Sequence, residues 1–169
     1  RVRMNENQSR LGSAQHILIW GAGHGIGLAV IQELLEKYPQ KNLYAIYRNK
    51  DKASELLALE KENASLTTLQ VDLLSDIDRG KESVKEFLHD IQLDLCFVTT
   101  GYLHDEEFRP EKSIKSLNEE YFIRSMMTNA FLPLKIAKLI LPLLSKEAVF
   151  AALSAKVGSI EDNQLGGWL

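Results

Sequence analysis

The chain has 169 residues, of which 45% are hydrophobic and 25% are charged, and its net charge is −3. These values are typical of one globular domain with its own core, and they give no electrostatic reason to expect nucleic acid or a membrane surface as a partner. The single cysteine, Cys96, excludes an internal disulfide, and its apolar neighbours indicate a plain buried residue. No cluster of metal ligands is visible in the sequence, so we expect no metal site.

The first 14 residues are polar and lack the apolar core of a signal sequence. We expect residues 1–14 to be a disordered lead-in and residues 15–169 to form one domain of a cytoplasmic protein. The longest apolar stretch, 131–144, contains two lysines and two prolines. We expect it to be too short and too charged to span a bilayer.

Strands and helices alternate along the domain. Apolar runs predict strands at 16–20, 43–47, 66–73, 93–100 and 148–154, and helical spacing predicts helices at 26–38, 51–62, 75–91 and 116–144. The strand runs are nearly continuous in apolar residues, as in a sheet that is covered on both faces. The expected fold is therefore α/β: a Rossmann-type, doubly wound parallel sheet with helices on both faces and five strands in the order 3-2-1-4-5.

Two of these helices carry start signals. Ser75 with Asp78, and Ser116 with Glu119, have the spacing of capping boxes. Pro133 lies inside the last helix, where we expect it to bend or strain the backbone.

Four glycines lie at alternate positions between the first strand and the first helix, within "GAGHGIG" at 21–27. Glycine permits a tight turn and lets the backbone approach a phosphate, and the helix N-terminus that follows attracts an anion. The common G-x-G-x-x-G fingerprint would need glycine at Ile26. The spacing that fits is G-x-x-x-G-x-G, on Gly21, Gly25 and Gly27.

This spacing resembles the TGxxxGxG motif of the short-chain dehydrogenase/reductase family, with Trp20 in the place of the threonine. The resemblance covers the chain from about residue 16 onward. It implies that the loop binds a nicotinamide dinucleotide through Gly21, Gly23, His24, Gly25, Ile26 and Gly27.

The end of the second strand indicates which dinucleotide is bound. An acidic residue there would bind the ribose of NAD, but this chain has Tyr47 and Arg48. A guanidinium can pair with the 2′-phosphate of NADP, so we expect NADP rather than NAD.

Further positions match the family one by one. Asp72, with Leu73, ends the third strand where the family's aspartate faces the adenine. "VTTG" at 98–101 aligns with the family's NNAG, which places Thr100 and Gly101 beside the cofactor, although only the glycine is identical. Asn129 matches the family's active-site asparagine.

The family's catalytic serine aligns with Ala155, next to Ser154, which we take as its candidate replacement. The stretch from 153 to 167 is similar to the C-factor-like and sniffer-like carbonyl reductase branch. No tyrosine in the chain has a lysine four residues later. In the family that YxxxK motif follows shortly after this point, so we expect an N-terminal portion of a longer reductase, inactive by itself.

The resemblance implies an NADP-dependent oxidoreductase that transfers hydride between nicotinamide and a small-molecule carbonyl or alcohol, and we expect a homo-oligomer, a dimer or a tetramer. The alternative is a non-catalytic, C-factor-like NADP-binding protein in cell signalling. A methyltransferase using S-adenosylmethionine is less consistent, because it would need an acid at Tyr47 or Arg48. The identity of the substrate is not predicted.

Overall fold

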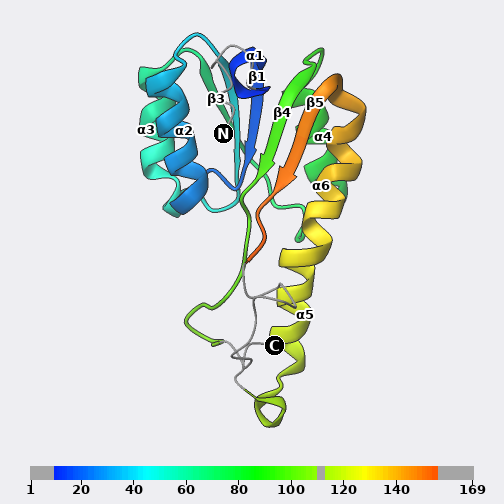
Figure 1. Cartoon of the computed structure of the whole chain (residues 1–169). Coiled ribbons are helices and arrows are strands. Elements are labelled where there is room, and N and C mark those ends of the chain that lie inside the picture. The colour runs from blue at the N-terminus through cyan, green and yellow to red at the C-terminus, as the bar shows by residue number, and fades with distance from the viewer. Residues whose placement is uncertain (1–9, 110–112, 156–169) are drawn as a thin grey trace, which may run out of the picture.

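The computed structural model describes residues 10–109 and 113–155, and its strands form one parallel sheet (Figure 1). The strands are β1 (His16–Trp20), β2 (Asn42–Tyr47), β3 (Leu66–Gln70), β4 (Leu93–Val98) and β5 (Leu144–Ala152). Their order across the sheet is β3-β2-β1-β4-β5, which confirms the predicted doubly wound fold. β2 and β3 lie on one side of β1, and β4 and β5 lie on the other, so the strand order reverses between β1 and β4.

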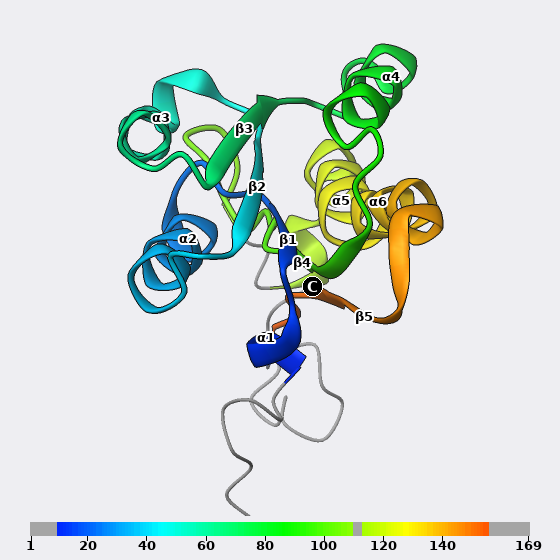
Figure 2. The same ribbon diagram turned by 90° about the horizontal axis from the view of Figure 1, so that it is seen from above.

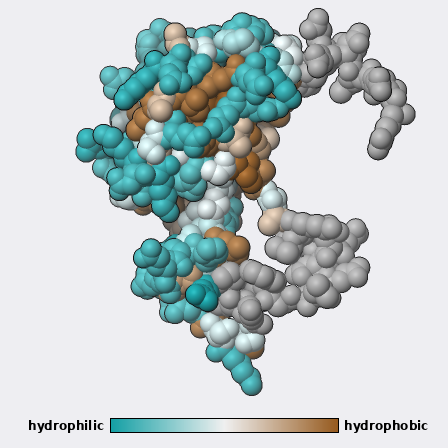
Figure 3. All heavy atoms as spheres, turned by 90° about the vertical axis from the view of Figure 1, so that its left-hand side faces the viewer, coloured by the Kyte–Doolittle hydropathy of each residue, from teal (hydrophilic) through white to brown (hydrophobic). Residues whose placement is uncertain are grey.

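Helices cover both faces of this sheet (Figure 2). They are α1 (Arg10–Ser13), α2 (Gly25–Lys37), α3 (Ser54–Glu62), α4 (Ile77–Phe87), α5 (Glu119–Met126) and α6 (Leu132–Ile140). α2 and α3 lie on one face, and α4 and α6 lie on the other. Seen from the side of α2 and α3, the surface is mostly hydrophilic, and a band of hydrophobic residues shows between the hydrophilic ones (Figure 3).

The alternation of side chains along β1 divides the core in two. Ile17 and Ile19 pack with residues of α2 and α3, whereas Leu18 and Trp20 pack with residues of α4 and α6. Cys96 is fully buried on the α4 side, as predicted, and burial raises the pKa of its thiol to about 12. A thiol with that pKa stays protonated at neutral pH, so its role is packing.

The N-terminal segment is more ordered than its sequence predicts. Residues 10–13 form helix α1, and Ala14 is buried, whereas residues 1–9 of the expected lead-in lie outside the described residues. The reason is Lys41, which is 1% exposed and whose ammonium donates to the carbonyls of Gly12 (3.0 Å) and Ala14. The lysine thus satisfies carbonyls that α1 leaves unpaired at its C-terminal end.

The helix starts differ slightly from the predicted capping boxes. Asp76, not Ser75, caps α4, and Asn118, not Ser116, caps α5. In each case the side-chain oxygen accepts the backbone N–H of the residue three positions later, at 3.2 Å for Asp76 and 2.9 Å for Asn118. Asp and Asn are as favourable as Ser at this position, so sequence alone did not distinguish among neighbouring candidates.

The long helical run changes its hydrogen bonding near Pro133. A π-helical turn, Met127–Phe131, joins α5 to α6, and Pro133 lies in the first turn of α6. Proline has no N–H to donate to the carbonyl four residues earlier, which belongs to Asn129. The expected irregularity is therefore present, as a wider turn directly before the proline.

The run Glu119–Leu143 is, within 10–109 and 113–155, the one helical segment long and apolar enough to cross a membrane by length and composition. We did not expect this from 131–144 alone. In the fold, its α6 half packs on the sheet through Leu132, Ile136 and Ile140. Its other side leaves several large apolar side chains exposed: Phe122, Ile123, Met126, Met127, Phe131, Leu134 and Leu141.

Candidate functional site

A cleft of about 640 Å³ opens at the carboxyl ends of the strands, where β1 and β4 lie side by side and the strand order reverses. Its walls come from the glycine turn after β1, from the loops after β2, β3 and β4, and from α5. In an open α/β sheet this is the place where ligands bind. Figure 1 shows α5 and the loop after β4 projecting past the strand ends beside this region.

The glycine turn, residues 21–25 between β1 and α2, is held tightly against β2. Gly21 has a φ of +95°, and the N–H groups of Gly21 and Ala22 both donate to the carbonyl of Ile46, at 2.8 and 2.9 Å. A Cβ on Gly27 would lie only 2.3 Å from the carbonyl oxygen of Gly21. The first turn of α2 therefore packs directly on the glycine turn, which no larger residue at 27 would allow.

The middle of the same turn faces open space. Gly25 has a φ of +60°, and a Cβ built on it would meet nothing within 4 Å. His24 is the N-cap of α2, but its side chain makes no capping hydrogen bond, and Ile26 is 59% exposed. Gly21, Gly23, His24, Gly25 and Ile26 all line the cleft, whereas Gly27 lies behind them. The positive end of the α2 dipole thus points into the cleft without a side-chain cap.

Thr99 fastens the glycine turn to β4. Its hydroxyl lies 3.0 Å from the carbonyl of Trp20 and 3.2 Å from that of Gly21, and its own N–H donates to Trp20 at 2.8 Å. The same hydroxyl would be 2.6 Å from a Cβ on Gly27. Thr99 is the second residue of the VTTG stretch, and its hydroxyl ties the end of β1 and the glycine turn to β4.

The end of β2 brings cationic side chains to the cleft. Arg48 lines it, as predicted, together with Asn49 and Lys52, which the sequence analysis missed. Asn49 accepts the N–H of Asp51 at 2.8 Å and so begins the short 3-10 turn that carries Lys52. The basic segment 48–52 was a visible signal, but only the turn brings Lys52 back to the cleft.

The remaining predicted cofactor residues also lie on the cleft wall. Asp72 and Leu73 follow β3, and Thr100 and Gly101 follow β4. One carboxylate oxygen of Asp72 accepts the N–H of Leu74 at 2.9 Å, so this residue also shapes its own loop. Among the described residues, the Thr100 hydroxyl is the one buried side-chain polar atom without a hydrogen-bond partner.

These features fit a dinucleotide. The open space at Gly25 suits a phosphate, the α2 N-terminus and the cations beside β2 suit its charge, and the unpaired Thr100 hydroxyl offers a hydrogen bond inside the cleft. No group of His, Cys, Asp or Glu in the part of the chain that the structure describes is arranged to hold a metal ion.

The two predicted catalytic residues are not brought together on the cleft wall. Asn129 lies in the π turn, where its amide accepts the N–H of Tyr102 and donates to its carbonyl, each at 2.7 Å. The side chain therefore holds the segment after Gly101 and does not line the cleft. Ser154 is exposed just after β5, and it too is absent from the cleft wall.

The cleft wall beyond the end of β4 is formed by Tyr102, Asp105 and Arg124, which were not predicted from the sequence. Nothing in the local sequence marks them, because Arg124 lies 19 residues beyond the aspartate with which it pairs.

A parallel sheet in this order, with a glycine turn and an uncapped helix N-terminus at the point of reversal, defines a dinucleotide-binding protein of the Rossmann type. The model of the short chain dehydrogenase family matches residues 15–160. The chain belongs to this family.

Individual relatives agree with that assignment. The chain is 33% identical over 128 residues to the oxidoreductase lepF of Aspergillus flavus, an alignment that covers 71% of this chain and 35% of that protein. Its fold is similar to that of the carbonyl reductase Sniffer of D. melanogaster, with a TM-score of 0.77, 27% identity and coverage of 90% of this chain and 66% of the other.

A carbonyl reductase from Pseudomonas aeruginosa PAO1, solved in complex with NADP, has a TM-score of 0.78 at 23% identity, over 92% of this chain and 65% of its own. The chain thus spans about a third of the curated relative and just under two thirds of these solved structures. Parts of those proteins have no counterpart here. Residues 156–169, which carry most of the similarity to the C-factor-like branch, lie outside the described residues.

Proposed function

We propose that the protein is an NADP-dependent oxidoreductase that transfers hydride between the nicotinamide and a carbonyl or alcohol substrate. The observation that carries the proposal is the glycine turn: its open side at Gly25 meets the uncapped N-terminus of α2 and the cations of the β2 end in one cleft. Membership of the family, and relatives named as an oxidoreductase and as carbonyl reductases, support the reaction class.

In this proposal, residues from different loops contact different parts of the cofactor. When bound, the cofactor supplies or accepts the hydride. In the proposal, the backbone at Gly23–Gly25 binds the pyrophosphate, Arg48 and Lys52 pair with the 2′-phosphate, and Asp72 faces the adenine. Arg48 and Lys52 are the chemistry that favours NADP, because a phosphate dianion pairs with guanidinium and ammonium groups whereas a ribose hydroxyl does not need them.

The proton on the substrate oxygen needs a general acid, which in this family is the tyrosine of YxxxK. The 169 residues contain no such pair. We therefore propose carbonyl reduction for the full-length protein, with Ser154 near the substrate oxygen, as the family resemblance implies. For Asn129 we propose a positioning role through Tyr102, which its hydrogen bonds support.

Titration of the full-length protein with NADPH and NADH, followed by cofactor fluorescence, tests the proposal. We expect NADPH to bind about 10- to 100-fold more tightly, since a charge-assisted contact to phosphate contributes about 1.5–3 kcal/mol. Arg48→Ala should remove most of this preference, whereas Arg79→Ala, an exposed arginine on α4 outside the cleft, should leave it unchanged. Equal affinity for both cofactors in the wild-type protein would contradict the proposal.

A further inference from the structure

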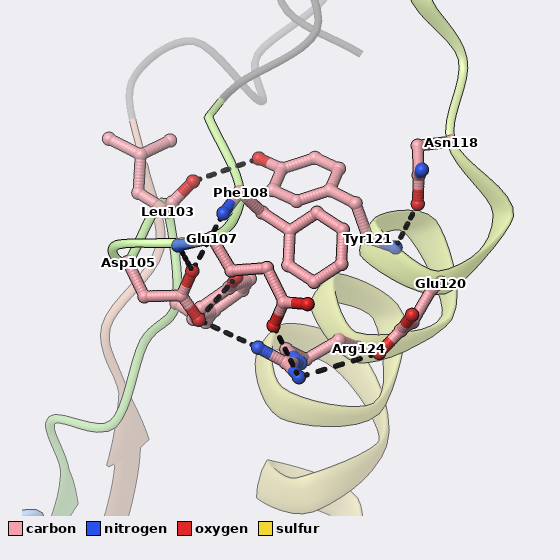
Figure 4. Close-up of polar contacts among 9 residues, drawn as sticks. Leu103, Asp105, Glu107, Phe108, Asn118, Glu120, Tyr121 and Arg124 are labelled. Atoms are coloured by element: carbon pink, nitrogen blue, oxygen red, sulfur yellow. Dashed lines mark hydrogen bonds and ion pairs between the residues drawn. The ribbon is translucent and has the colours of Figure 1, made fainter.

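A cluster of charged and aromatic side chains joins the loop after β4 to the start of α5 (Figure 4). Its centre is Arg124, whose two terminal nitrogens contact three carboxylates: Nη1 lies 2.6 Å from Asp105, and Nη2 lies 3.6 Å from Glu120 and 3.8 Å from Glu107. The guanidinium also lies 5.0 Å from the ring centre of Phe108. A planar, forked cation is suited to hold carboxylates and a ring at the same time.

Asp105 gives the loop its shape. One of its oxygens accepts the N–H groups of Phe108 (2.8 Å) and Glu107 (3.0 Å), and the other accepts the hydroxyl of Tyr102 (3.0 Å) as well as pairing with Arg124. The N–H of Phe108, the Tyr102 hydroxyl and the nearby guanidinium hold the pKa of this carboxyl below its usual range. Asp105 is therefore charged at neutral pH and keeps the loop folded onto α5.

This arrangement holds Tyr102 at its backbone, its hydroxyl and its ring. Asn129 holds both its N–H and its carbonyl, Asp105 holds its hydroxyl, and its ring lies 5.8 Å from the Arg124 guanidinium and 5.9 Å from the ring of Tyr121. Tyr121 is buried, and its hydroxyl donates to the carbonyl of Leu103 at 2.9 Å. Tyr102 follows Gly101 directly and lines the cleft at the reversal of strand order.

The cluster also places a net charge next to this wall. Asp105 lines the cleft together with Arg124, whereas Glu107 and Glu120 contact the same guanidinium from outside the described cleft wall, so the cluster as a whole carries two net negative charges. The other cationic side chains on the described cleft wall, those of Arg48 and Lys52, come from the segment after β2, which lies on the other side of β1 from β4. A substrate carboxylate at the β4 end would find Arg124 already paired with carboxylates. The net negative charge of the cluster would also repel it.

We propose that Arg124 is a positioning residue that fixes Tyr102 and the loop 102–109 as the substrate-end wall of the cleft, and that the carboxylates around it make this wall select uncharged carbonyl compounds over carboxylate-bearing ones. The inference rests on the proposed function and names the substrate class of the same site. In this proposal the phosphate binds beside the cations Arg48 and Lys52, and the substrate binds beside the carboxylate cluster around Arg124.

Two aldehydes of similar size test the selectivity in the full-length protein: 4-nitrobenzaldehyde, which is neutral, and 4-carboxybenzaldehyde, which is an anion. The measured quantity is the ratio of their kcat/KM values with NADPH, compared between wild type and variants so that intrinsic reactivity cancels. We expect Glu107→Gln/Glu120→Gln to shift the ratio at least threefold toward the carboxylate. Glu36→Gln/Glu62→Gln removes two exposed carboxylates from α2 and α3, neither of which pairs with Arg124, and should leave the ratio unchanged.

Arg124→Met and Arg124→Lys test the positioning role. Arg124→Met should raise the KM for 4-nitrobenzaldehyde at least fivefold, with kcat and the dissociation constant of NADPH changed less than twofold, and amide exchange in residues 102–109 should accelerate. Arg124→Lys keeps the charge but not the fork, so we expect an intermediate KM.

Different results would overturn the proposed function and the inference about Arg124. Absence of NADPH binding would overturn the proposed function and the inference with it. A protein that binds NADPH but reduces neither aldehyde, an unchanged selectivity ratio in Glu107→Gln/Glu120→Gln, or an unchanged KM in Arg124→Met would overturn the inference and leave NADP binding standing.

Discussion

Two glycines at the start of α2, Gly25 and Gly27, differ in what surrounds them, and so they differ in what they do. Gly27 has the backbone of Gly21 pressed against it, whereas Gly25 has open space. The first is needed for the fold and the second, in our proposal, for the ligand. Substitutions at the two positions should therefore separate folding from binding.

Gly25→Val should abolish cofactor binding at a modest cost in stability. Its φ of +60° costs a residue with a Cβ about 1–2 kcal/mol, but no neighbour blocks the side chain. We expect NADPH affinity to fall at least 100-fold while the protein still unfolds cooperatively in a thermal melt. Gly27→Ala is the matched contrast, because its Cβ meets the Gly21 carbonyl and should lower the melting temperature more. Retained NADPH affinity in Gly25→Val would show that the turn does not hold the phosphates.

Thr99→Val should weaken cofactor binding without unfolding the protein. The change keeps the shape of the side chain but removes its hydrogen bonds to the carbonyls of Trp20 and Gly21. With a net loss of about 0.5–1.5 kcal/mol, we expect the NADPH dissociation constant to rise about 2- to 13-fold. Thr67→Val, on the exposed side of β3, is the control in the same fluorescence titration. Equal effects of the two substitutions would contradict a role for Thr99 in shaping the turn.

At the scale of elements, polar side chains connect the strands at their amino-terminal ends, which lie opposite the cleft. Asp94, at the start of β4, accepts the N–H groups of Gln15 (2.8 Å) and His16 (3.1 Å), and it contacts the hydroxyl of Ser145 at 3.2 Å. It thus connects β4 to the beginning of β1 and to β5. Burial opposes the ionisation of Asp94, but these hydrogen bonds outweigh burial and lower its pKa.

Asp94→Ala should lower the free energy of unfolding by about 1–3 kcal/mol at pH 7, since it leaves N–H groups without their acceptor. Because the pKa is lower in the folded state, the ionised carboxylate stabilises the protein above the usual aspartate pKa of about 3.9, and this contribution is lost as the pH falls through the folded-state pKa. Urea unfolding should therefore show a smaller difference from wild type at pH 3 than at pH 7. A difference that does not depend on pH, or one equal to that of the exposed Glu36→Ala, would count against this account.

Considered as a whole, the molecule carries a long helical run that packs on the sheet at one end and projects past it at the other (Figure 1). Leu134 is 66% exposed on this run, and Phe131 is 47% exposed. Large apolar side chains gathered on one helical surface are a feature of interaction sites. We propose that the protein is a homo-oligomer and that this surface contributes to its interface.

Leu134→Glu should therefore shift the full-length protein toward smaller species, because it places a charge within an apolar contact. Size-exclusion chromatography with light scattering at about 10 µM protein is the measurement. Ile77→Glu, an exposed apolar residue on α4, is the control. An oligomeric state that Leu134→Glu does not change would remove this surface from the interface.

The sequence by itself determined the fold and predicted most of the residues that line the cleft after β1, β2 and β3. Apolar runs predicted the five strands, although β5 begins at Leu144 and not at 148. The strand-helix alternation predicted the sheet order, because parallel strands joined by right-handed crossovers leave few topologies. The glycine spacing, Arg48, Asp72 and Gly101 are local signals, since each acts next to a strand end. Lys52 belongs to the same basic segment, but the turn that brings it to the cleft was not predicted.

Only the tertiary structure decided which distant residues meet. The order of α1 depends on Lys41, and the role of Asn129 depends on Tyr102, residues that lie 27 or more positions apart. Arg124 and Asp105 meet because the loop after β4 folds against α5, and no spacing in the sequence encodes that contact. Hydrogen bonds and ion pairs between distant segments form where packing places the backbone, so a sequence reveals the residue types but not the pairs.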